Sequence, residues 1–115
     1  KYAESKAKTH YERAGYAVDY VGNKKPYDFE CRKGNNVLRV EVKGTTTDGR
    51  SVFLTANEVA SARAHPTALF LVHSIQLMGS GKSRLPSAGQ TNIYEPWEID
   101  QNGTLRSMVY EYTLH

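Results

Sequence analysis

Cysteine is nearly absent from this 115-residue chain, since Cys31 is the only one. A single thiol cannot form an internal disulfide bond, and it cannot build a cysteine-rich zinc site. The first residue is Lys1 and not methionine, so we expect the sequence to be a piece of a larger protein. The length fits one domain over residues 1–115 and is too short for a barrel enzyme.

Long apolar runs are also missing. No stretch approaches the roughly 18–20 apolar residues that a membrane helix needs, and the opening KYAESKAKTH lacks the apolar centre of a secretory signal. Hydrophobic residues make up 39% of the chain, which is typical of a globular protein and not of a disordered one. We therefore expect an intracellular protein, cytoplasmic or, in a eukaryote, nuclear, with no membrane partner.

Positive charge is concentrated in the first half of the chain. Residues 1–50 contain eleven Lys and Arg against seven Asp and Glu, whereas residues 51–115 contain four against five. A basic half is compatible with a polyanionic partner such as nucleic acid, although charge alone favours an ordinary solvated surface.

The pattern of apolar residues predicts alternating helices and strands. We expect helices at 2–14 and 56–64, and strands at 17–21, 27–32, 37–43, 51–54, 68–77, 92–99 and 105–114. The second helix begins with a capping box, TANE at 55–58, in which Thr55 is the cap, and it ends before Pro66. The order predicts an α/β fold with a mixed sheet flanked by helices.

One Gly- and Ser-rich segment, residues 78–90, predicts a flexible loop. Its GSGKS sequence superficially resembles a phosphate-binding loop. The spacing excludes that motif, because Gly79 is only three positions before Lys82.

The most informative residues are two short clusters, Pro26-Tyr27-Asp28 and Glu41-Val42-Lys43. Glu41 and Lys43 are two apart on an expected strand, so their side chains share one face of the sheet. A turn at 33–36 would bring Asp28 beside Glu41. Alternating charge on a strand is also typical of a solvent-facing surface with cross-strand ion pairs.

Two carboxylates beside an ammonium group fit a Mg²⁺ or Mn²⁺ site. These hard cations take oxygen ligands and keep several waters. Asp28, Glu41, the Val42 backbone carbonyl and a phosphate could complete the shell. Lys43 would then orient or activate water, or stabilise charge on phosphorus.

These clusters resemble the signature of the PD-(D/E)XK nucleases, a proline–aspartate pair followed by acid-any-lysine. The expected order of helix, three strands, helix and strand resembles their restriction-endonuclease-like core. The longer stretch AGYAVDYV…YDFECR…LRVEVKGTT…VFLTANEVASAR…LFLVHSI is similar to the NO VEIN-type domain.

The resemblance implies that Asp28 and Glu41 bind the metal and that Lys43 is the catalytic lysine. Many members add an acid from the first helix, for which Glu4 is the nearest candidate within the chain. Possible contacts to nucleic acid come from basic or hydroxyl side chains near these positions, namely Lys24, Lys25, Thr45, Thr46 and Arg63.

Two functions follow from this reading. The first is a Mg²⁺-dependent deoxyribonuclease domain of a larger restriction, defence or repair protein, with DNA and the other domains of that protein as partners. The second is a non-catalytic module with a nuclease-like fold that binds nucleic acid or protein. Homodimer formation stays open in both.

Overall fold

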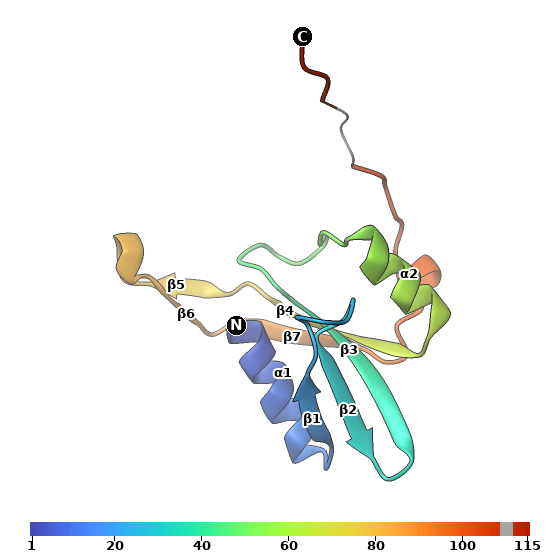
Figure 1. The fold of residues 1–115 in the computed structure, drawn as a ribbon. Coiled ribbons are helices and arrows are strands. Elements are labelled where there is room, and N and C mark those ends of the chain that lie inside the picture. The colour runs from blue at the N-terminus through green and yellow to red at the C-terminus, as the bar shows by residue number, and fades with distance from the viewer. Residues whose placement is uncertain (109–111) are drawn as a thin grey trace.

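The computed structural model describes residues 1–108 and 112–115. A five-stranded sheet with the order β1-β2-β3-β4-β7 forms the centre of the fold (Figure 1). The elements are α1 (Tyr2–Arg13), β1 (Ala17–Tyr20), β2 (Phe29–Lys33), β3 (Asn36–Gly44), α2 (Ala56–Ala64), β4 (Thr67–His73), β5 (Gln76–Met78), a 3₁₀ turn (Gly81–Ser83), β6 (Leu85–Ser87), β7 (Gln90–Tyr94) and α3 (Ile99–Asn102). Only β3 and β4 pair in parallel, so the sheet is mixed, as expected.

Helix α1 covers one face of the sheet because its small apolar residues recur on one side. Ala3, Ala7 and Tyr11 are its buried residues, at spacings of one helical turn. The helix ends at Arg13, and Gly15 follows with a φ of +96°, which glycine adopts without strain.

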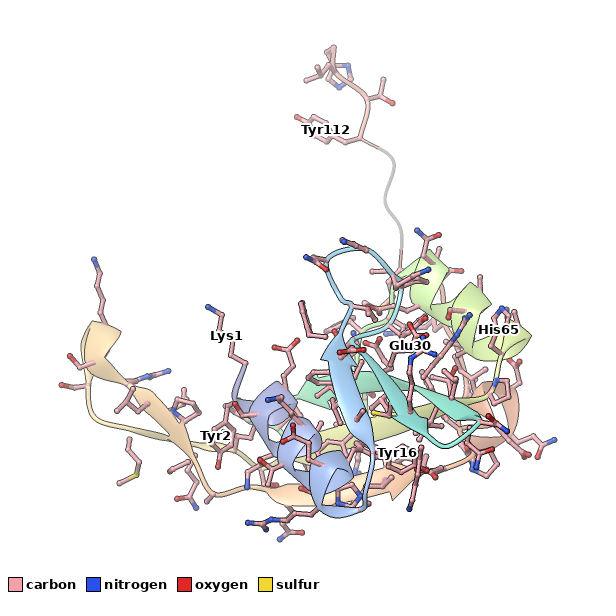
Figure 2. All side chains as sticks on the ribbon, turned by 60° about the horizontal axis from the view of Figure 1, so that its bottom comes forward. Lys1, Tyr2, Tyr16, Glu30, His65 and Tyr112 are labelled. Carbon is pink, nitrogen blue, oxygen red and sulfur yellow. The ribbon has the colours of Figure 1, made fainter. Side chains whose placement is uncertain are left out.

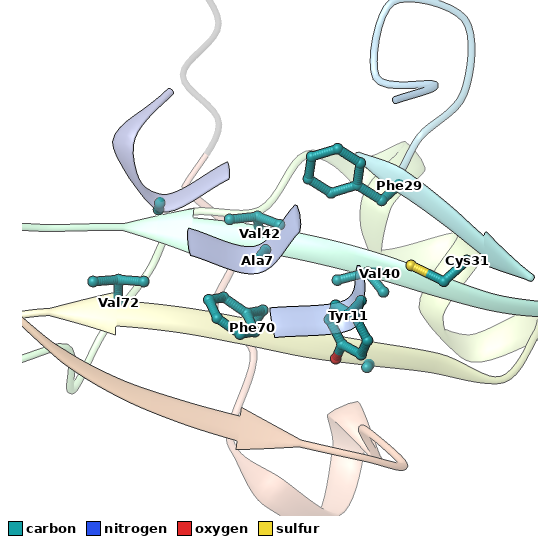
Figure 3. Close-up of a cluster of buried hydrophobic side chains, with 10 residues drawn as sticks. Ala7, Tyr11, Phe29, Cys31, Val40, Val42, Phe70 and Val72 are labelled. Carbon is teal, nitrogen blue, oxygen red and sulfur yellow. The ribbon is translucent and has the colours of Figure 1, made fainter. Parts of the chain in front are cut away.

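The main core lies between α1 and the sheet. Alternate residues of the strands point to this side, and Figure 3 shows them packed beneath Ala7 and Tyr11. They are Phe29, Cys31, Val40, Val42, Ala68, Phe70 and Val72. Because Val40 and Val42 face α1, Glu41 and Lys43 must face the other side of the sheet.

The opposite face carries a smaller apolar cluster under α2 and α3. Its buried members are Ala62, Leu69, Trp97 and Ile99. Thr55 caps α2: its hydroxyl accepts a hydrogen bond from the Glu58 N–H at 3.1 Å, and the Glu58 carboxylate accepts one from the Thr55 N–H at 3.0 Å. The predicted capping box is confirmed, and it fixes the start of α2 on this face.

The expected strand at 51–54 is wrong. These residues form no strand; they belong to the connection that carries the chain from β3 to the parallel strand β4. Phe53 is 77% exposed, whereas Val52 and Leu54 are half-buried. The alternate burial of Val52, Phe53 and Leu54 therefore belongs to an irregular segment that lies on the surface and pairs with no neighbouring strand.

The expected strand at 68–77 and the loop at 78–90 also need correction. Strand β4 ends at His73, and Ser74 adopts a φ of +55° where the chain turns. The next residues form a separate two-stranded sheet, in which β5 pairs with β6 through Gln76↔Ser87, Leu77↔Pro86 and Met78↔Leu85. In Figure 1 this hairpin extends away from the five-stranded sheet.

The last part of the chain differs from the expected strands as well. Strand β7 is shorter than the expected strand at 92–99, and α3 occupies the last residue of that expected strand and the three that follow it. Residues 105–108 and 112–115 are not in a strand, and the middle of the expected strand at 105–114 lies outside the described residues. No helix in the described ranges is long and apolar enough to span a membrane.

Candidate functional site

Asp28 lies immediately before β2, where the edge of β3 is open. Its N–H donates to the Val40 carbonyl at 2.9 Å, and its side-chain Oδ2 accepts from the Val42 N–H at 2.8 Å. The carboxylate thus accepts the hydrogen bond that a backbone carbonyl would accept if β2 continued beside β3 on the N-terminal side of Phe29. Burial raises the pKa of Asp28; the hydrogen bond from Val42 opposes this rise, and the negative charge of Glu4 adds to it.

Glu41 is the most deeply buried charged residue of the described chain, with 3% of its surface exposed. Its Oε2 lies 3.3 Å from the Lys43 ammonium. The other oxygen, Oε1, has no hydrogen-bond partner among the residues that the structure describes. Burial and then the charge of Asp28 raise the pKa of Glu41 to about 8, despite the opposing effect of Lys43.

Lys43 links the sheet to α2. Its Nζ lies 3.3 Å from Glu41 Oε2 and 3.1 Å from Glu58 Oε1. Burial alone would lower the pKa of Lys43, but the hydrogen bonds to Glu58 and Glu41 and their negative charges outweigh that effect and raise it. The lysine therefore stays protonated, and its side chain is still 22% exposed.

The three predicted site residues are therefore brought together from two elements. Asp28 reaches β3 at Val42, and Glu41 and Lys43 flank that residue. Three carboxylates, those of Asp28, Glu41 and Glu58, surround one ammonium group, so ionisation of all four leaves an excess of negative charge. Burial first, and then this excess of negative charge, raise the pKa of Glu41.

Glu58 is a member of this cluster that the sequence pattern assigned only to helix capping. Its Oε1 accepts hydrogen bonds from both the Thr55 N–H and Lys43 Nζ. The capping box was the one sequence signal for this role, because it places Glu58 at the end of α2 that meets the sheet. The contact between Glu58 and Lys43 depends on how α2 packs on the sheet, and the sequence does not give that packing.

Glu4, the candidate helix acid, lies on the first turn of α1. It is near enough to Asp28 for its negative charge to raise the pKa of that carboxyl. The first turn comes close to β3 because both partners are small: a Cβ added to Gly44 would lie 2.9 Å from Ala3 Cβ.

Thr45 and Thr46 follow the site directly along the chain. The Thr45 side chain is engaged in its own turn, where its hydroxyl accepts from the Thr47 N–H at 3.1 Å. Thr46 is exposed. Of the two, Thr46 has the more accessible hydroxyl for a ligand.

The basic candidates are divided between two places. Lys24 and Lys25 are exposed in the loop that leads to Asp28, where their N–H groups both donate to the Val21 carbonyl. Arg63 lies near the C-terminal end of α2 and forms a bidentate ion pair with Asp100. Its Nε donates to Oδ2 at 2.9 Å and its Nη2 donates to Oδ1 at 2.7 Å. Arg63 thus joins α2 to α3 in this structure, away from the Glu58 end of the helix.

The described residues, 1–108 and 112–115, contain no group of three or more His, Cys, Asp or Glu side chains arranged to hold a metal ion. The side chains that could contribute here are two, Asp28 and Glu41. The Val42 carbonyl lies on the same side of β3 as its N–H, which faces Asp28, because both groups of a strand residue point to the same neighbour.

Comparison with known proteins identifies one family. No curated protein and no solved structure matches the chain. The family described as Protein NO VEIN, C-terminal, matches residues 1–85, which include helices α1 and α2, the strands β1 to β4 and all residues of the cluster. The chain therefore belongs to the Protein NO VEIN C-terminal family.

Proposed function

We propose that this domain is a divalent-metal-dependent hydrolase of DNA phosphodiester bonds, with Asp28, Glu41 and Lys43 as its working residues. Two features support a PD-(D/E)XK-type nuclease. The acids and the lysine stand in the order of that signature, and the elements run α1-β1-β2-β3-α2-β4, as in its core.

The unpartnered Oε1 of Glu41 is the observation that carries the proposal. A buried acceptor with no partner in the described part of the chain destabilises the fold by roughly 1–3 kcal/mol. A second carboxylate nearby raises this penalty when both are ionised. A bound cation would remove both effects, since it supplies positive charge where the protein supplies too little.

The oxygen atoms around Glu41 fit Mg²⁺ or Mn²⁺. Such ions are commonly held by one or two carboxylates and complete their shell with water and substrate phosphate. Here the candidate ligand atoms are Glu41 Oε1, Asp28 Oδ1 and the Val42 carbonyl oxygen.

Lys43 has a role that its surroundings define. When bound, a divalent cation lowers the pKa of a coordinated water and withdraws charge from the phosphate. The ammonium of Lys43 is held between Glu41 and Glu58 and stays protonated, since its pKa is raised. Lys43 therefore stabilises the negative charge that develops on phosphorus, and it does not act as the base.

DNA as the substrate is supported by the distribution of charge. The half of the chain that contains the cluster is the basic half, with eleven Lys and Arg against seven Asp and Glu. Lys24 and Lys25 are exposed in the loop before Asp28, where they can contact the backbone on either side of a scissile phosphate.

Nicking of supercoiled plasmid DNA in the presence of Mg²⁺ or Mn²⁺ tests this function. We expect Lys43→Met, which keeps the side-chain length and removes the charge, to slow cleavage by roughly 100-fold or more. Lys8→Met is the matched control, because Lys8 lies on the exposed side of α1 and forms its ion pair with Glu12, one helical turn away. Equal rates for wild type and Lys43→Met would contradict the proposal.

A non-catalytic nucleic-acid-binding module is the second candidate. It is favoured by the ion pairs of Lys43 with Glu41 and Glu58, because these two carboxylates already neutralise the positive charge that a catalytic lysine would offer to a phosphate. This candidate predicts that Asp28→Asn leaves DNA binding in EDTA unchanged and that the wild type does not cleave with either metal.

A further inference from the structure

The β5–β6 hairpin contributes almost no side chains to the hydrophobic core. We define the arm as residues 76–87, which include β5, the 3₁₀ turn and β6. Residues 76–86 are all exposed, and Figure 1 shows the arm projecting from the body of the protein. Isolated two-stranded hairpins are at best marginally stable in water, so an arm of this kind needs a partner or a firm base.

The base of the arm is firmly attached beside the candidate site. The Ser74 N–H donates to the Thr47 carbonyl at 2.7 Å, and the Ile75 N–H donates to the Thr45 carbonyl at 3.2 Å. On the other strand, the Tyr2 hydroxyl donates to the Ala88 carbonyl at 2.8 Å, and Figure 2 shows Tyr2 at the foot of the hairpin. The arm thus begins beside the loop of Thr45 to Thr47, which follows the end of β3.

The composition of the arm is basic and apolar. It contains Lys82 and Arg84, two of the four basic residues of the second half of the chain, and residues 74–89 include no Asp or Glu. Its exposed apolar side chains lie on the paired strands: Leu77 is 40% exposed, Met78 58% and Leu85 69%. Met78 and Leu85 are direct cross-strand partners. Exposed apolar side chains gathered on one projecting element indicate an interaction surface.

We propose that the arm inserts into a groove of duplex DNA, with Lys82 and Arg84 on the phosphates and Met78 and Leu85 against the base edges or steps. A two-stranded ribbon fits a DNA groove, and Met and Leu are among the residues that proteins wedge between base steps. With about 3.3 Å per residue, the five residues from 76 to 80 reach roughly 15 Å from the sheet.

This inference extends the proposed function, because it places the arm in a groove next to the phosphate that Asp28, Glu41 and Lys43 would act on. Strands β3 and β4 are parallel, so Lys43 and the base of the arm lie at the same end of the sheet. The alternative partner for such an arm is a second copy of the chain, which the test below distinguishes.

The test measures binding of a fluorescein-labelled 30-base-pair duplex by anisotropy in EDTA, where cleavage is excluded. We expect Lys82→Gln with Arg84→Gln to weaken binding by roughly tenfold and to lower the slope of log affinity against log salt by about two. Lys8→Gln with Arg13→Gln removes the same charge from α1 and should change affinity less than twofold. A further variant, Met78→Ser with Leu85→Ser, should weaken binding at unchanged salt slope.

Three outcomes of the binding test would overturn the proposal, and a dimer that depends on the arm would replace it. Equal affinity for the wild type and the arm variants, or equal losses for the arm and the α1 variants, would show that the arm does not contact DNA. A wild type that does not bind the duplex would show the same. If sedimentation reveals a dimer that the arm variants dissociate while DNA affinity is unchanged, the arm binds a second copy. Loss of cleavage with intact arm-dependent binding would instead contradict only the proposed function.

Discussion

The Glu41 side chain takes up its proton at a different pH in the folded and the unfolded protein. Its pKa is about 8 in the folded protein and 4.5 for an unperturbed glutamate. Between these values the folded state binds more protons than the unfolded state, so the free energy of unfolding falls as pH rises from 4.5 to 8. Below this window both states are protonated, and above it both are ionised.

Glu41→Gln should therefore remove this pH dependence in metal-free buffer. We expect the wild type to lose stability on the order of a few kcal/mol between pH 5 and pH 9, and the variant to lose clearly less. Urea unfolding in EDTA at both pH values measures the difference. Parallel losses in wild type and variant would show that Glu41 is not the group responsible.

The individual residues of the site were predictable to different degrees. Asp28, Glu41 and Lys43 could be found because the two-residue period of a strand places Glu41 and Lys43 on one face and a hairpin brings Asp28 across. Glu58 could not be assigned to the cluster, since its contact with Lys43 depends on how α2 packs. The hydrogen bond from the Val42 N–H to Asp28 replaces a bond between strands, and no sequence pattern indicates it.

The packing of α1 on β3 depends on two residues without large side chains. A Cβ on Gly44 would lie 2.9 Å from Ala3 Cβ, closer than such atoms approach in proteins. Gly44 has no positive φ, so the requirement for glycine here is steric and not conformational. The first turn of α1, with Glu4, is held near Asp28 by this contact.

Gly44→Ala should push the first turn of α1 away from the sheet and lower the free energy of unfolding by about 1–3 kcal/mol. Gly103→Ala is the control, because a Cβ at that position meets nothing within 4 Å and the residue has extended backbone. Urea unfolding of the two variants provides the comparison. Equal stabilities would mean that the helix and the strand adjust without strain.

Helices and strands were predicted well where the signal is local. The apolar stripe of α1, the capping box of α2 and the alternation of β3 each lie within the element itself. The segment at 51–54 has the composition of a strand, but whether it pairs depends on a neighbouring strand that it does not meet. The arm was missed for the opposite reason, because Gly and Ser are typical of loops and the pairing of β5 with β6 needs only three residues each.

The arrangement of the whole molecule brings the site, the base of the arm and the Thr45–Thr47 loop to one end of the sheet. That end is where the parallel strands β3 and β4 finish. The order of the strands could not be derived from the sequence, because parallel pairing of β3 and β4 depends on the path of the connection between them. A duplex approaching this end would meet both the acidic cluster and the basic arm.

Calorimetric titration of the DNA-free protein with Mn²⁺ at pH 8 tests most directly whether Asp28 and Glu41 form a cation site. We predict that the wild type binds one Mn²⁺ and that Asp28→Asn and Glu41→Gln each weaken binding by roughly tenfold or more. Asp48→Asn is the control, because Asp48 is exposed and pairs with Arg50. No Mn²⁺ binding by the wild type, or binding that both site variants retain, would contradict the metal-dependent hydrolase.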